Sequence, residues 1–311
     1  MADGGRQTFI VGPIFCFWLI ISSSGCFQAS EARADQAKNL TTPLSFEEGW
    51  AELQEAFTRA TELNGSIFRL FTSDEYIRFY KTVYEHCADN HHMSAQFYEG
   101  YKNFFKEYLT SKVLPSLREK KDEKLLQELV RTWSNFKTTT GWLSRFFYYL
   151  NRYYLPFTKQ PSLRETSYLS FYKLVYGEVN DQVRDVLIDM IDQEQEGGQI
   201  DEALVKNVLD VYVEMAEGSM KFYVKDFEEA LLKDTARFYH KKAVGLMTID
   251  SDDESMRKVK EWVEREREGT SYLKVSQKKL LQVSEHELLT KQVIKEQHEE
   301  KLQSRALMAD E

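Results

Sequence analysis

A nine-residue pattern occurs twice in this chain of 311 residues, the copies lying about ninety positions apart. Residues 76–84 read YIRFYKTVY and residues 168–176 read YLSFYKLVY, so both fit Y-[IL]-x-F-Y-K-x-V-Y. A second pair follows them: DEKLL at residues 122–126 precedes Trp133, and DEALV at residues 201–205 precedes Tyr212. Paired echoes indicate an internal repeat, and repeat proteins characteristically hold partners on extended surfaces.

The residues between these patterns favour helices. Only 5 prolines and 14 glycines interrupt the chain, and apolar residues recur at helical spacing between charged ones. With 42% hydrophobic and 29% charged residues, the chain can bury a substantial core. The formal net charge of -9 gives no basic surface for nucleic acid. The composition therefore predicts an all-α protein that does not bind nucleic acid.

The amino terminus differs from the rest. Residues 9–21 read FIVGPIFCFWLII, and residues 32–34, ARA, are typical of a signal-peptide cleavage site. The apolar run has about 13 residues, and a transmembrane helix needs about 20. A signal peptide, an unstructured extension and a wrongly assigned first exon all stay open. The 3 scattered cysteines favour a reducing compartment.

The first copy of the pattern lies on a predicted helix that follows a capping box at residues 45–48, SFEE, and a turn at residues 64–65. Ser73 or Asp74 is expected to cap this helix. Its apolar stripe contains Tyr76, Phe79, Tyr80, Val83, Tyr84 and Cys87. Tyr84 and Cys87 are expected in the core, whereas the other four are divided evenly between core packing and a docking surface.

The densest aromatic segment is WLSRFFYYLNRYYL, residues 142–155. Its apolar side chains occupy nearly the whole circumference of a helix, so it must be enclosed or must present one aromatic side to a partner. Pro156 and Pro161 mark a boundary between the two repeats. A helix capped by Asp201 follows the Gly197-Gly198 turn in the second repeat.

Catalytic motifs are weak throughout. No Gly-rich phosphate loop occurs, and no Ser-His-Asp or Cys-His arrangement stands out. His86, Cys87, His91 and His92 form the one compact group of metal-ligand residue types, but their spacing fits no familiar zinc motif. We therefore expect no enzyme activity, no metal and no cofactor.

Seven segments resemble the amino-terminal region of a cullin, most of all the plant cullins of the SCF type. They are FEEGW (46–50), YIRFYKTVYEHC (76–87), VLPSLREKKDEKLLQELVRTWSNFK (113–137), WLSRFFYYLNRYY (142–154), LVYGEVNDQV (174–183), EGGQIDEALVKNVLDVYVEM (196–215) and DFEEALLKDTARFY (226–239).

This resemblance implies an all-α, elongated stalk of cullin repeats, which are five-helix bundles stacked end to end. We expect an amino-terminal extension over residues 1–43, a first repeat over 44–160 and a second over 161–280. A truncated start of a third repeat would occupy residues 281–311.

In the family, the second and fifth helices of the first repeat bind a Skp-type adaptor that carries an F-box protein. Carried over by motif, the adaptor-binding site comprises Tyr76, Phe79, Tyr80, Val83, Tyr149, Asn151 and Arg152. Replacing Tyr76 and Phe79 by Ala is expected to weaken adaptor binding by at least about 2 kcal/mol without unfolding the chain. The second copy, at residues 168–176, is expected to be packing.

Cullins continue into a carboxy-terminal domain that holds the RING-box protein and bears the neddylated lysine. These residues end before that domain, so a RING-box partner is not expected. The resemblance implies a non-enzymatic scaffold of ubiquitin ligase assembly, linked to ubiquitin-dependent protein catabolism. Its folded part is expected away from membranes, in the cytoplasm and nucleus, or in the secretory route if residues 1–34 act as a signal peptide. The alternative is a helical-repeat interaction protein or gene fragment without ligase function.

Overall fold

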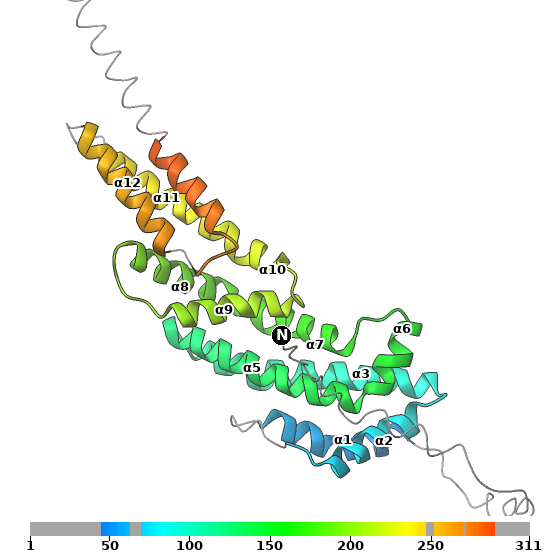
Figure 1. Ribbon diagram of the computed structural model, residues 1–311. Coiled ribbons are helices and arrows are strands. Elements are labelled where there is room, and N and C mark those ends of the chain that lie inside the picture. The colour runs from blue at the N-terminus through cyan, green and yellow to red at the C-terminus, as the bar shows by residue number, and fades with distance from the viewer. Residues whose placement is uncertain (1–44, 63–69, 247–251, 270–271, 290–311) are drawn as a thin grey trace, which may run out of the picture. The chain divides into compact units, whose positions relative to one another are not determined.

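The computed structural model describes residues 45–62, 70–246, 252–269 and 272–289, and all regular secondary structure within them is helical (Figure 1). The α-helices are α1 (Phe46–Thr61), α2 (Ser73–Cys87), α3 (His91–Tyr108), α4 (Leu114–Arg118), α5 (Asp122–Phe146), α6 (Leu155–Phe157), α7 (Leu163–Phe171), α8 (Gly177–Gln195), α9 (Glu202–Met215), α10 (Lys221–Tyr223), α11 (Glu229–Leu246) and α12 (Asp252–Gly269). A last helical stretch covers residues 277–289. The prediction of an all-α fold is confirmed.

Four π-helical turns join these helices: η1 (Leu109–Val113), η2 (Leu150–Tyr154), η3 (Tyr172–Tyr176) and η4 (Val224–Glu228). A π-turn inserts a residue into the helical repeat and rotates the side chains that follow it. Periodicity gave no sign of these turns. They matter here because η2, η3 and η4 all carry residues of the surfaces discussed below.

Side-chain caps fix where several helices begin. The Ser45 hydroxyl accepts the Glu48 amide proton at 3.2 Å, so α1 begins where the capping box predicts. Asp201 caps α9 in the same way, at 2.9 Å from the Leu204 nitrogen. The cap of α2 is Thr72, paired reciprocally with Glu75, rather than the predicted Ser73 or Asp74. Thr72 is the cap because Glu75 lies three residues after it and completes a capping box.

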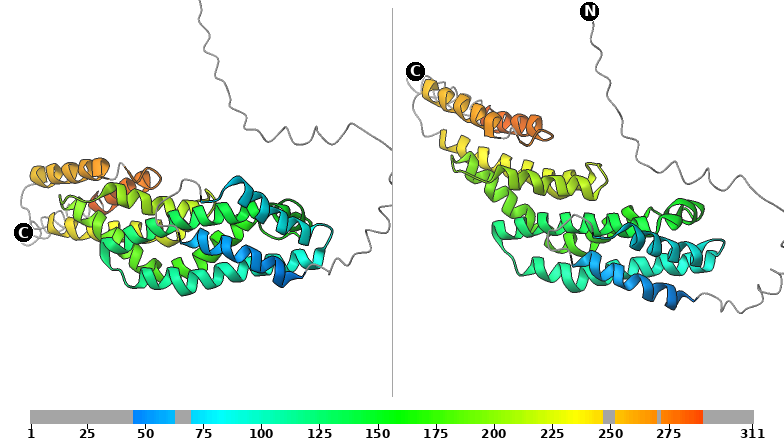
Figure 2. Two further views of the ribbon diagram at one scale, coloured as in Figure 1. Left: turned by 90° about the horizontal axis from the view of Figure 1, so that it is seen from below. Right: turned by 60° about the horizontal axis from the view of Figure 1, so that its bottom comes forward.

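Helix α5 lies at the centre of the packing. It contacts α1 and α2 on one side and α7, α8 and α9 on the other, as the two orientations of Figure 2 also show. One buried apolar cluster extends from Leu53 of α1 to Leu280. A smaller cluster joins α11 and α12 around Tyr239 and Val259. The repeat boundary at residue 160 stays a prediction, since the core runs through it.

Two glycines let the first three helices come close together. A Cβ at Gly49 of α1 would stand 2.7 Å from the His86 ring of α2 and 2.8 Å from Phe97 of α3. A Cβ at Gly100 of α3 would meet Trp50 of α1 at 2.7 Å. Glycine is therefore required at both positions for this spacing of α1, α2 and α3.

The apolar run at residues 9–21, with Cys16 and Cys26, lies outside the described residues. Among the described helices, none combines the length and the apolar character that a bilayer crossing requires.

Candidate functional site

The stripe on α2 divides into two parallel rows. Phe79 and Val83 are fully buried, as is Cys87, and the Phe79 ring packs 5.2 Å from Phe146 of α5. The expectation that Phe79 and Val83 contribute surface to the adaptor site is wrong for this reason: both are core residues that tie α2 to the bundle.

The second row consists of tyrosines. Tyr76 stacks on Tyr80 with ring centroids 6.4 Å apart, and Tyr80 stacks on Tyr84 at 6.1 Å. Tyr84 was expected in the core, yet 45% of it is exposed. Residues 76, 80 and 84 are spaced four apart, so they form one row beside the row of Phe79 and Val83. Tyr76 and Tyr80 are half-buried at the edge of the core, Tyr76 with its ring centroid 6.0 Å from that of Phe146, and Tyr84 is exposed.

Residues that follow α5 continue this aromatic surface. The Tyr84 ring meets Tyr149 edge-on at 5.5 Å, and Tyr149 contacts Tyr153 at 5.2 Å. Tyr148 is 51% exposed and Tyr153 59%. We call the surface made by Tyr76, Tyr80, Tyr84, Tyr148, Tyr149 and Tyr153 the tyrosine face. It combines three of the seven expected site residues with three that the motif transfer did not include.

The two remaining expected residues lie on η2 and have different roles. The Asn151 side chain accepts the Leu163 amide proton at 3.1 Å, so it fixes the start of α7. Arg152 is exposed and forms no ion pair within the part of the chain that the structure describes. Its guanidinium is therefore free to bind a carboxylate of a partner.

Burial raises the pKa of the Tyr80 phenol, and the neighbouring phenols of Tyr76, Tyr84, Tyr153 and Tyr148 add to the shift. The Tyr80 ring lies between those of Tyr76 and Tyr84, on both of which it stacks. A phenol that keeps its proton acts as a hydrogen-bond donor. Tyr80 is therefore a hydrogen-bond donor between Tyr76 and Tyr84.

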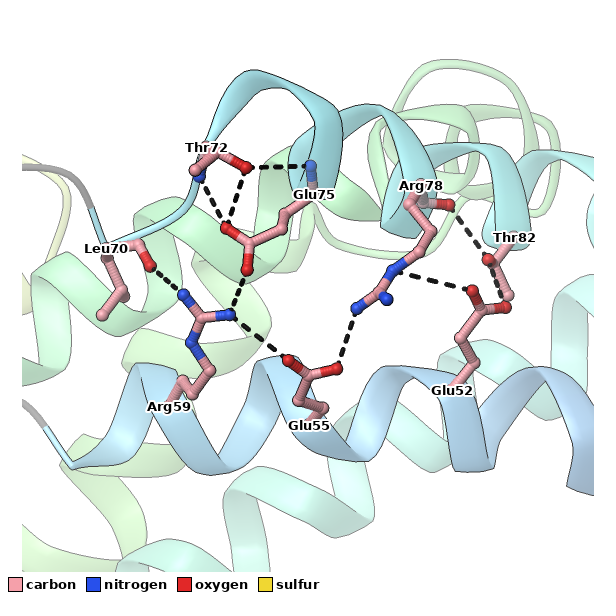
Figure 3. A network of polar contacts seen from close by, with 8 residues as sticks. All are labelled: Glu52, Glu55, Arg59, Leu70, Thr72, Glu75, Arg78 and Thr82. Atoms are coloured by element: carbon pink, nitrogen blue, oxygen red, sulfur yellow. Dashed lines mark hydrogen bonds and ion pairs between the residues drawn. The ribbon is translucent and has the colours of Figure 1, made fainter.

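A polar network holds α2 on α1 (Figure 3). Arg59 of α1 bonds the Glu75 carboxylate at 2.5 Å and the Leu70 carbonyl at 2.6 Å. Arg78 of α2 bonds Glu55 of α1 at 2.8 Å. The Arg59 hydrogen bond and the capping Thr72 lower the pKa of Glu75 to about 2. These contacts fix how α2 is turned, and so which of its rows faces outward.

The second copy of the pattern is covered by its own chain. It spans α7 and η3, where Phe171, Val175 and Tyr176 are fully buried. Tyr172 stacks face to face on Phe222 of α10 with centroids 3.6 Å apart, and its hydroxyl donates to Asp226 of η4 at 2.9 Å. The prediction that this copy is packing is confirmed.

The group of metal-ligand residue types at the end of α2 does not form a site. His86 bonds the Thr82 carbonyl through Nδ1 at 2.7 Å, and burial raises the pKa of the Cys87 thiol to about 12. His91 instead packs against the Phe157 ring at 5.0 Å. Across the described ranges, no three His, Cys, Asp or Glu side chains are grouped to hold a metal ion.

Two hollows lie near these helices. A groove of about 640 Å³ between α1 and α3 is lined by Trp50, Phe57, Phe104 and Tyr108 among others. A hollow of about 170 Å³ beside the tyrosine face is lined by Tyr149, Tyr153 and Phe157, among others. The smaller hollow is also lined by Cys87, Asp89, His91 and Ser94. Burial raises the pKa of the Cys87 thiol to about 12, so this hollow holds no thiolate nucleophile at neutral pH.

Sequence reasoning missed Tyr84, Tyr148 and Tyr153. The tyrosines at positions 76, 80 and 84 do not signal exposure, because the second copy has tyrosines at positions 168, 172 and 176 and Tyr176 is fully buried. Nor does any signal separate Tyr148 and Tyr153 from the buried Phe146 and Phe147.

Comparison with known proteins agrees with this fold. The Cullin family, described as the cullin alpha solenoid domain, matches residues 50–311. Cullin-1 of Oryza sativa subsp. japonica is 43% identical over 263 residues, which is 82% of this chain and 35% of that protein. Putative cullin-like protein 2 of Arabidopsis thaliana is 40% identical over 263 residues, 82% of this chain and 70% of that protein.

A shorter relative is Cullin-like protein 3 of Arabidopsis thaliana, 35% identical over 232 residues, which is 74% of this chain and 90% of that protein. The chain thus spans 35% of the length of Oryza cullin-1 and most of the length of this cullin-like protein. The family match covers α1 through α12 with little of α1 left out. On its sequence and its helical-repeat fold, the chain belongs to the cullin family.

Proposed function

We propose that this chain is a scaffold that binds a Skp-type adaptor of SCF ubiquitin ligases, with its F-box protein, through the tyrosine face. In this role it contributes to ubiquitin-dependent protein catabolism by position rather than by catalysis. Its place of action is then the cytoplasm and nucleus, where such ligases meet their substrates.

The observation that carries the proposal is the difference in cover between the two copies of the pattern. Tyr84 is 45% exposed, whereas its counterpart Tyr176 is fully buried. Side chains at equivalent positions of the pattern are therefore buried in the second copy and exposed in the first. In a stack of repeats, such an uncovered end must bind something or be capped.

The chemistry of the tyrosine face suits a protein partner. Tyrosine is among the residue types most enriched at binding hot spots, because its ring buries a large area at small entropic cost and its hydroxyl stays paired. Arg152 adds an exposed cation at the rim. A face of this kind favours a partner with apolar and acidic side chains.

Titration calorimetry of the full chain with a purified Skp-type adaptor bound to an F-box protein tests the proposal. Tyr80→Ala and Tyr84→Ala are each expected to weaken binding by at least about 2 kcal/mol, or roughly thirtyfold. Tyr108→Ala is the matched control, because this half-buried tyrosine lines the groove between α1 and α3 instead. Its affinity should equal that of the unchanged chain.

If the unchanged chain does not bind the adaptor, the proposal is wrong. The alternative from the sequence would then apply, namely a helical-repeat interaction protein or gene fragment without ligase function. If Tyr80→Ala and the unchanged chain bind the adaptor equally, the adaptor remains the partner, but the tyrosine face is not its binding site.

A further inference from the structure

The two copies of the repeated pattern have the same local geometry. Tyr80 and Tyr84 stack with centroids 6.1 Å apart and an interplanar angle of 23°, and Tyr172 and Tyr176 stack at 5.9 Å and 20°. The edge-on contact recurs as well. Tyr84 makes it with Tyr149 at 5.5 Å, and Tyr176 with Tyr212 at 5.1 Å. Each copy thus presents its second tyrosine, Tyr80 or Tyr172, in similar surroundings.

What covers the second copy is a helical segment of this same chain. Phe222 lies flat on Tyr172, with an interplanar angle of 8° and centroids 3.6 Å apart. Four residues later, Asp226 accepts the hydrogen bond of the Tyr172 hydroxyl at 2.9 Å. Asp226 is only 9% exposed, so this carboxylate is withdrawn from water in order to meet the phenol. One ring and one carboxylate, one helical turn apart, complete the contact.

The corresponding positions around Tyr80 are open. Within the described ranges, Tyr80 stacks only on Tyr76 and Tyr84 of its own helix. Its hydroxyl has no hydrogen-bond partner among those residues, and its side chain is only half-buried. The first copy therefore has a tyrosine equivalent to Tyr172, but the described residues supply no equivalent of Phe222 and Asp226 to contact it.

We propose that the partner of the tyrosine face presents a helix with an aromatic residue and, four positions later, an aspartate or glutamate. The ring stacks on Tyr80 and the carboxylate accepts the Tyr80 hydroxyl, which reproduces the contact of Phe222 and Asp226 with Tyr172. This inference rests on the proposed function, because the helix then belongs to the adaptor or its F-box protein. The uncompensated charge of Arg152 favours the same acidic character.

Tyr80→Phe is the sharpest test, since it removes the hydroxyl and keeps the ring. Its affinity for the purified adaptor–F-box complex is expected to fall about tenfold, as for the loss of a hydrogen bond to a carboxylate. Tyr108→Phe is the matched control, because Tyr108 lines the groove between α1 and α3 and lies outside the tyrosine face. Its affinity should change less than about twofold.

A double-mutant cycle then locates the covering helix. Each aromatic and acidic pair spaced four apart on the adaptor complex is changed, the acid to its amide. One of these amide variants should bind the unchanged chain more weakly than the original complex does. The same amide change should not weaken binding to Tyr80→Phe, because the hydroxyl that it would have bonded is already absent. If Tyr80→Phe binds as tightly as the unchanged chain while Tyr80→Ala does not, the inference is wrong and the proposed function stands.

A peptide of residues 219–233 tests the inference without the adaptor. It carries Phe222 and Asp226, and it should shift the Tyr80 signal in tyrosine-labelled NMR spectra of the full chain. The same peptide with Phe222→Ala or Asp226→Asn should shift it several-fold less at equal concentration. If the unchanged chain fails to bind the adaptor, this peptide decides the question, and equal shifts from all three peptides would overturn the inference.

Discussion

The indole nitrogen of Trp133 donates a hydrogen bond to the Glu214 carboxylate at 2.6 Å, and this contact joins α5 to α9. Trp133 is 2% exposed, so its N–H has no access to bulk water. The Lys137 ammonium bonds the same carboxylate oxygen, also at 2.6 Å. The Glu214 carboxylate of α9 thus receives two donors from α5.

Glu214→Ala should destabilise the chain by about 1–3 kcal/mol, because it leaves the buried indole N–H unpaired. Glu214→Gln keeps an acceptor and should cost clearly less. Urea unfolding followed by circular dichroism measures both free energies of unfolding. Equal stability of Glu214→Ala and the unchanged chain would show that the indole finds another acceptor.

Phe79→Ala should act on folding rather than on binding, contrary to the expectation from the family motif. The Phe79 ring is fully buried between Phe71 and Phe146, at 5.8 and 5.2 Å. Removing it leaves a cavity that costs about 3–5 kcal/mol. Tyr80→Ala, one residue along and partly exposed, should cost less than half as much. Thermal unfolding of the two variants compares them directly.

The sequence predicts some of these features and not others, for physical reasons. Helix starts at Ser45 and Asp201 could be predicted because a cap depends on neighbours three residues away. The inward side of α2 could not, because Phe79 and Tyr80 belong to adjacent rows that are both apolar enough to be buried. Tertiary contacts from α1 and α5 decide between the rows.

The site has the same limit. Tyr80 and Tyr172 occupy equivalent positions of one pattern, but Phe222 covers only Tyr172. Nothing in residues 76–84 encodes that difference in cover. Asn151 looked like a contact residue by motif, yet its side chain serves the start of α7. Its role depends on the turn η2, which has no signature in the sequence.

Stability should fall as pH rises through the acidic range, because of a carboxylate pair between α8 and α11. Burial, followed by the Asp234 carboxylate, raises the pKa of Asp192 from 3.8 to about 7, and Asp189 and Glu196 add to the shift. Asp234 also pairs with Arg237. The native chain therefore holds a proton on Asp192 that the unfolded chain releases above pH 3.8.

The free energy of unfolding contributed by Asp192 is thus greatest below its ordinary pKa and is lost as pH rises to about 7. Asp192→Asn should flatten this dependence, since the amide cannot release a proton. Asp210→Asn, on an exposed part of α9, should leave it unchanged. Urea unfolding across this pH range measures each slope, and an unaltered slope for Asp192→Asn would assign the dependence to other groups.

We expect the charge of Lys242 on α11 to stabilise the packing of α12 through cation–π contacts. Its ammonium lies 4.1 Å from the centroid of the Phe238 ring and 5.3 Å from that of Trp262 on α12. A cation over two rings is worth about 0.5–2 kcal/mol when partly desolvated. Lys242→Met keeps the apolar stem and removes the charge, so it should increase amide hydrogen exchange in α12 while α5 stays protected. Lys242→Arg, which retains a cation able to stack on Trp262, should exchange like the unchanged chain. Lys242→Met keeps the stem, so a change confined to α12 in this variant alone would assign the effect to the cation rather than to the packing of the stem.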